Sequence, residues 1–167
     1  MGTKRVGWAR IKSLINENKN QLKFLKRQLL AVSAAKTLTA NDSGALIHWT
    51  HGSAHDITLP DAEVGLNYTF VLVAGAAANH HILSQTADKF YGKAIVVTTH
   101  ATHDSANQIV LKASGLNKVF LHKTGATSGG DAGDTVTITC VEAGFWTTQA
   151  NLVTTHATPA SVAVFTD

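Results

Sequence analysis

The sequence predicts an all-β fold, an antiparallel β-sandwich or small β-barrel, preceded by an N-terminal amphipathic α-helix of the coiled-coil type. Residues 8–32 carry a seven-residue apolar repeat, which indicates a helix. From Thr37 onward, short apolar or alternating runs are separated by Gly, Asn, Asp and Ser, which indicates strands joined by turns. At 167 residues, the chain accommodates a basic arm with an oligomerising helix (1–36) and one β-rich body domain (37–167).

The apolar repeat of the arm predicts a helix that associates with other copies of the chain. A strict spacing of 3.5 residues over more than three heptads is typical of a coiled-coil seam, whereas the apolar stripe of a single surface helix drifts. Asn18 is the one polar seam residue, and such a residue commonly fixes the register and number of strands. With Trp8 at heptad position a, the expected oligomer interface consists of Trp8, Ile11, Ile15, Asn18, Leu22, Leu25, Leu29 and Val32.

The charges of the arm and the body are opposite. Residues 1–36 contain nine Lys or Arg and one Glu, a formal charge of +8, whereas the remaining residues contain five Lys and ten Asp or Glu, a charge of −5. Such an arm fits an acidic protein surface, nucleic acid or the acidic bodies of its own oligomer, or it is only a solvated basic face. We expect no nucleic-acid partner, because no aromatic stacking platform accompanies the basic residues.

The body is expected to contain ten strands. Their spacing of roughly 8 to 14 residues is typical of a sandwich or barrel and not of βαβ units. The expected strands are Ala45–Trp49, Asp56–Leu59, Asn67–Ala74, His80–Ser84, Lys93–Thr99, Gln108–Ala113, Lys118–Lys123, Asp134–Val141, Gly144–Thr148 and Val162–Thr166.

The core of the body follows from alternation along these strands. Val136, Ile138 and Cys140 fall on one face of their strand, so we expect all three to be buried together with Trp146, Phe70, Val71 or its alternating neighbours, and Val96. Cys140 is the single cysteine, which excludes an internal disulfide framework, and its position predicts a small buried hydrophobe and no reactive thiol.

The residues that most resemble chemical sites do not form a convincing one. Nine histidines are present, and the clusters His80–His81 and His100–Asp104 invite a metal hypothesis. Adjacent strand residues point to opposite faces, so His80 and His81 cannot face one ion together. The carboxylates sit mainly at turns, and the glycine-rich loop 125–133 lacks the Lys and helix of a phosphate cradle. We therefore expect no enzyme activity, no metal and no cofactor.

The arm also carries no targeting or membrane-spanning signal. Lysines interrupt its apolar residues every few positions, so no continuous apolar segment approaches the ~20 residues that a bilayer requires. We expect a soluble protein that is made in a reducing cytoplasm.

Several phrases of the body resemble virion structural proteins of tailed bacteriophages. The stretch Thr37–Gly44, followed by Asp56–Phe70 with its Leu-Pro turn, is similar to a strand, turn and strand of a small β domain in those proteins. The closing phrase Gly133–Ile138 with Gly144–Trp146 resembles their terminal hairpin, and the opening Met1–Gly7 with the Lys-rich helix is similar to head-associated proteins of marine phages, cyanophages in particular.

The resemblance implies a capsid decoration (cement) protein: a homotrimer on the capsid surface of a virion assembled in the host cytoplasm. Its implied partners are the major capsid protein and neighbouring decoration trimers, and no membrane. For the capsid contact we expect the basic residues Lys19, Lys23, Lys26 and Arg27. The alternative is a trimeric tail or head fibre or knob adhesin that binds a receptor on the host surface.

Overall fold

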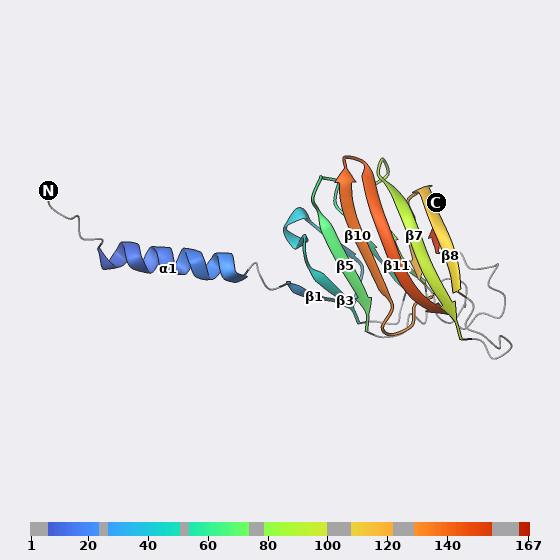
Figure 1. Cartoon of the computed structure of the whole chain (residues 1–167), viewed down its shortest axis with the longest axis horizontal. Helices are drawn as coiled ribbons and strands as arrows, with labels where there is room; N and C mark the ends of the chain where they lie inside the picture. The colour runs from blue at the N-terminus through green and yellow to red at the C-terminus, as the bar shows by residue number, and fades with distance from the viewer. Residues whose placement is uncertain are drawn as a thin grey trace.

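The computed structural model describes residues 7–23, 27–50, 54–73, 79–99, 108–121, 129–154 and 164–167. In these ranges the chain forms helix α1 (Trp8–Lys23), a short 3-10 helix η1 (Ala40–Asp42) and strands that pack as two sheets (Figure 1). Helix α1 lies apart from the two sheets (Figure 1). None of the described helices is long and apolar enough to cross a bilayer.

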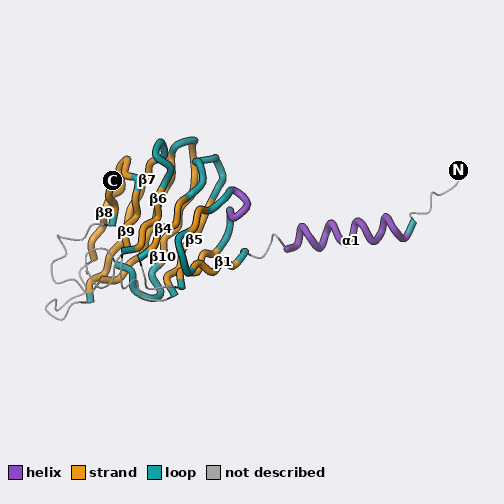
Figure 2. Tube along the Cα trace, turned by 180° about the vertical axis from the view of Figure 1, so that it is seen from behind, coloured by secondary structure: helices purple, strands orange, loops and turns teal. Residues whose placement is uncertain are grey.

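The larger sheet has seven strands and the smaller sheet has five. The larger sheet, in spatial order, contains β1 (Leu29–Val32), β3 (Leu46–Trp49), β5 (Asn67–Leu72), β10 (Thr135–Glu142), β11 (Phe145–Thr154), β7 (Lys89–Thr98) and β8 (Gln108–Leu116). The smaller sheet contains β12 (Phe165–Thr166), β9 (Lys118–Leu121), β6 (His80–Leu83), β4 (His55–Thr58) and β2 (Lys36–Thr37). Figure 2 shows β9, β6 and β4 from the other side.

The sandwich of the prediction is therefore observed, but its sheets are mixed and not antiparallel. The first six strands alternate between the two sheets, so β1, β3 and β5 are parallel neighbours, as are β2, β4 and β6. After each strand the chain crosses to the opposite sheet and then crosses back. Its next strand in the first sheet therefore runs in the same direction as the previous one. Turn signals and strand spacing are the same for this path as for hairpins, so the sequence alone favoured the wrong direction.

The helix ends earlier than the heptad repeat predicts. Strand β1 contains Leu29 and Val32 and pairs in parallel with β3, so the expectation that these two residues extend the helix was wrong. Val32 is buried in the sandwich, and its carbonyl oxygen accepts a hydrogen bond from the Thr50 N–H at 3.0 Å. A Leu-Leu-Ala-Val segment is compatible with a helix or a strand. The backbone groups at the edge of β3 pair with this segment and thereby select the strand. The body consequently includes residues that we had assigned to the arm.

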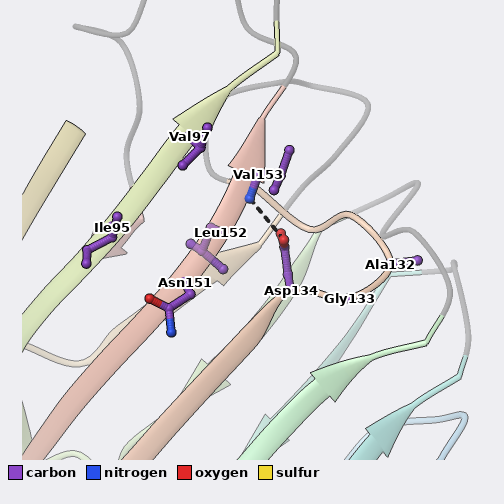
Figure 3. A pocket seen from close by; sticks show the side chains of 8 residues that line it. All are labelled: Ile95, Val97, Ala132, Gly133, Asp134, Asn151, Leu152 and Val153. Atoms are coloured by element: carbon purple, nitrogen blue, oxygen red, sulfur yellow. Dashed lines mark hydrogen bonds between the residues drawn. The ribbon is translucent and has the colours of Figure 1, made fainter. Parts of the chain in front are cut away.

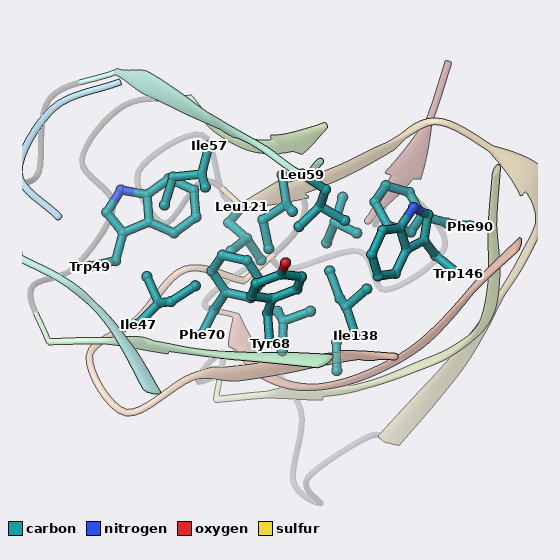
Figure 4. Close-up of a cluster of buried hydrophobic side chains, with 14 of the residues drawn as sticks. Ile47, Trp49, Ile57, Leu59, Tyr68, Phe70, Phe90, Leu121, Ile138 and Trp146 are labelled. Atoms are coloured by element: carbon teal, nitrogen blue, oxygen red, sulfur yellow. The ribbon is translucent and has the colours of Figure 1, made fainter. Parts of the chain in front are cut away.

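The expected core is confirmed except at Val71, which is only half-buried because it lies on the opposite face of β5 from Phe70. Val136, Ile138 and Cys140 lie on one face of β10 and are buried, as are Phe70, Val96 and Trp146. Large side chains from both sheets meet between the layers (Figure 4); those labelled are Ile47, Trp49, Ile57, Leu59, Tyr68, Phe70, Phe90, Leu121, Ile138 and Trp146. Tyr68 keeps its hydroxyl satisfied in this layer by donating to the Thr39 carbonyl at 2.9 Å.

Gly92 of β7 lies against the backbone of β11. This residue has a positive φ of 139° and pairs with Thr148, and a Cβ added to it would overlap the Thr148 carbonyl oxygen. Because that oxygen belongs to the backbone of a central strand, no side-chain rotation relieves the overlap.

We predict that Gly92→Ala destabilises the domain by about 2–4 kcal/mol, from backbone strain together with overpacking. Urea unfolding measures this change. Gly44→Ala is the matched control, because Gly44 also has a positive φ, of 81°, but an added Cβ would meet nothing within 4 Å. The control should lose only about 1–2 kcal/mol, the cost of the left-handed backbone. Equal losses in the two variants would contradict the close contact between β7 and β11.

Candidate functional site

The described part of the predicted interface is an unusual apolar surface on α1. Trp8 is 74% exposed, Ile11 37% and Ile15 46%, and Asn18 is exposed as well. Leu22 lies within α1, whereas Leu25 falls outside the described residues. These seam residues thus lie on an element that buries none of its described side chains against its own body, which leaves the apolar face for another molecule.

The structure describes the backbone of Lys19 and Lys23 and the side chain of Arg27 among the basic residues expected at the capsid. Lys19 and Lys23 lie on α1, and Lys26 falls outside the described residues. Arg27 instead reaches the body, where its guanidinium donates to the Thr69 hydroxyl on β5 at 2.7 Å. Gln28 adds a backbone link to the same side, because its carbonyl accepts from the Leu46 N–H at 2.7 Å. These contacts anchor the arm where it joins the larger sheet.

A shallow depression of about 560 Å³ lies on the outer face of the larger sheet (Figure 3). Its apolar part consists of Ile95 and Val97 from β7 and Val153 from β11, and Asn151 supplies a polar side chain. The turn 132–134 forms one wall. Sequence reasoning missed this surface, although Ala94 to Val97 are consecutive apolar residues and therefore place apolar side chains on both faces of the strand.

Asp134 holds this wall against the sheet. One carboxylate oxygen accepts from the N–H groups of Gly130 at 2.7 Å and Asp131 at 3.0 Å, and the other accepts from the Val153 N–H at 2.9 Å. Strand β10 begins only at Thr135, so this carboxylate continues the hydrogen bonding of β11 beyond the end of the ladder. Burial raises the pKa of Asp134 to about 6, although its three backbone donors favour the charged form.

A second cluster consists of histidine and tryptophan side chains at the end of the sandwich where β3 ends and β4 and β6 begin. The ring centroid of Trp49 lies 5.4 Å from that of His55 and 4.9 Å from that of His80. The Trp49 indole N–H donates to His55 Nε2, and His80 is buried. This arrangement packs the end of the core and uses the imidazoles as aromatic and hydrogen-bonding partners.

The two adjacent histidines face opposite ways, as expected. His80 points into the core, whereas His81 lies on the other face, where its Nδ1 is 2.6 Å from the Asp56 carboxylate. Among the described residues, no three His, Cys, Asp or Glu side chains are grouped to hold a metal. The cluster His100–Asp104 lies outside the described residues. Cys140 is buried, and burial raises the pKa of its thiol, which disfavours the nucleophilic thiolate.

Comparison with known proteins finds no matching family model, no matching curated protein and no matching solved structure.

The raised pKa of Asp134 predicts a pH dependence of stability. The folded protein binds a proton at this carboxylate more tightly than the unfolded chain does, so its contribution to stability is present below about pH 4 and is lost as the pH rises through about 6. Wild type should therefore lose roughly 2–3 kcal/mol relative to Asp134→Asn between about pH 4 and pH 7. Urea unfolding of both proteins across this range measures the difference. If the free energy of unfolding of wild type, relative to that of Asp134→Asn, stays constant or rises between these pH values, the raised pKa of Asp134 is contradicted.

Proposed function

We propose that the protein is a non-enzymatic structural protein of a phage virion, which decorates and stabilises the capsid as a homotrimer. The main support for this proposal is that α1 exposes a row of apolar side chains outside the sandwich. Two further features support the proposal. Segments of the body resemble virion structural proteins of tailed phages, and the arm and the body have opposite charges.

Energetics favour a partner for α1. An isolated helix of 16 residues is marginal in water, and α1 has no acidic residue in its first turn to favour its N-terminus. Full burial of Ile11 or Ile15 removes enough apolar surface to contribute roughly 1.5–3 kcal/mol per side chain. Association of three copies therefore stabilises both the helix and the assembly.

The described length of α1 also limits what the seam contributes alone. Trp8 to Lys23 includes five of the eight expected seam positions, and Leu29 and Val32 belong to the sandwich. A seam this short gives a marginal coiled coil, so a stable trimer needs further contacts that involve the bodies. Such contacts fix the bodies around the helices, which is the arrangement that a three-point clamp on a shell requires.

A trimer is suited to capsid decoration by multivalency. Each copy brings a basic arm of charge +8 and an acidic body of charge −5. Weak contacts from three copies act together because binding of the first raises the effective concentration of the others. The role needs complementary shape and charge and no chemical step.

We predict that Ile11→Asp combined with Ile15→Asp converts the trimer into monomers, because each change removes apolar burial and places a charge in the seam. Sedimentation velocity measures the outcome. Ser13→Asp combined with Asn16→Asp is the matched control, since it adds the same charge at two exposed helix positions outside the seam. The control should remain trimeric. A trimer that survives the Ile changes would reject the helix as the oligomeriser.

We also predict that particles stripped of this protein lose their DNA at a lower temperature than intact particles, because the clamp contacts are absent. Adding back the wild-type protein should restore the release temperature, whereas the Ile11→Asp and Ile15→Asp variant should not, since it binds through one copy at a time. DNA release on heating, followed with an intercalating dye, measures this. Stripped particles that stay equally stable but no longer adsorb to cells would replace this role with the adhesin alternative.

A further inference from the structure

Two turns at one end of the sandwich form a small surface that is both apolar and acidic. The loop before β5 and the end of β10 meet there, because the Gly65 N–H donates to the Cys140 carbonyl at 3.0 Å and the Cys140 N–H donates to the Leu66 carbonyl at 2.8 Å. This pairing brings the turn 63–66, which contains Val64, next to the end of β10, which contains Val141. Both valines are exposed, at 66% and 53%.

Acidic residues flank the two valines directly. Glu63 precedes Val64 and Glu142 follows Val141, and both glutamates are exposed. Within the described part of the chain, no salt bridge involves either glutamate. We call Glu63, Val64, Val141 and Glu142 the turn patch. It combines exposed apolar surface with negative charge that forms no salt bridge among the described residues.

The arm carries a complementary row of charge. With Trp8 at position a, four successive e positions of the arm are basic, occupied by Arg5, Lys12, Lys19 and Lys26. In most coiled coils, residues at e pair with opposite charges at g of a neighbouring helix. Here positions g are Gly7, Leu14, Gln21 and Gln28, none of which is charged. The helices of an oligomer therefore cannot neutralise the row among themselves at these positions.

We propose that the basic e row of one copy docks on the turn patch of a second copy of this chain. Lysine suits both halves of the patch, because its aliphatic stem covers apolar surface while its ammonium group reaches a carboxylate. Lys12 and Lys19 are seven residues apart on α1, about 10 Å along the axis, so one helix presents repeated cations to the glutamates. The seam residues at a and d stay free for the trimer.

The contact deepens the proposed function, on which it rests for the use of α1 between copies. It supplies the helix-to-body contact that the short seam requires. It also separates the basic residues by role: Lys19, at position e, faces another copy, whereas Lys23, at position b, remains for the capsid.

Zero-length carbodiimide cross-linking tests the contact. Full-length heavy-isotope and light-isotope chains are refolded together in equal amounts, cross-linked and digested for mass spectrometry. We expect amide links from Lys12 or Lys19 to Glu63 or Glu142 that join a heavy to a light peptide, and we expect their loss at about 0.5 M salt, which screens exposed charges.

Charge reversal gives the matched comparison. Lys12→Glu with Lys19→Glu in one chain, and Glu63→Lys with Glu142→Lys in another, should each abolish the links, and refolding the two variants together should restore links between the exchanged positions. Lys12 and Lys19 are on the helix, Glu63 lies in an exposed turn and Glu142 is the exposed last residue of β10, so the sandwich core is unchanged.

Each other outcome overturns the proposal. Links confined to heavy–heavy and light–light pairs would assign the row to the patch of its own body. An absence of links in a sample that sediments as a trimer would reject the patch and leave the proposed function standing. An absence of links in a sample that sediments as a monomer would reject both.

Discussion

Strand β11 is the element on which the rest of the sandwich depends. It pairs in parallel with β7 from Phe145 to Thr154 and antiparallel with β10, so it is bonded on both edges. The hairpin β10–β11 thereby lies between β5 and β7. It joins the parallel strands β1, β3 and β5 to the β7–β8 pair. Gly92 permits the close approach of the two backbones, and Trp146 fills the core from the same strand. Asp134 extends the hydrogen bonding where β10 is too short to do so.

This central strand also positions the outer surface. Because β11 alternates strictly, Val153 and Asn151 face outward while Leu152 faces the core. The depression of the larger sheet is therefore a consequence of the same register that builds the interior. Its wall is held by the Asp134 carboxylate, whose pKa is raised by burial, so the stability of the fold around this surface is linked to pH.

Local patterns predicted most of the secondary structure, and long-range pairing decided the rest. Each of the ten expected strands overlaps a strand of the structure, because period-two alternation and turn residues are local properties, but β11 continues to Thr154, six residues beyond its expected end. Strand direction depends on long-range connections. The chain passes from β1 through β2 of the opposite sheet to β3, which pairs beside β1, and the local amino-acid composition does not indicate this order. The predicted end of the helix was wrong for a related reason. Leu29 and Val32 fit a heptad and a strand equally well, and only their pairing with β3 selects the strand. The turn patch is also non-local, because its glutamates are far apart in the sequence.

The arm and the body have complementary properties that neither satisfies alone. The arm has an apolar seam and a basic row, and the body has exposed valines next to Glu63 and Glu142, which form no salt bridge in the described part of the chain. The central claim is that copies of the chain assemble through these features into a trimer. Light scattering coupled to size exclusion of the unmodified chain tests it most directly. The proposal predicts one species with three times the chain mass of 17.6 kDa, and a single species with the mass of one chain would contradict it.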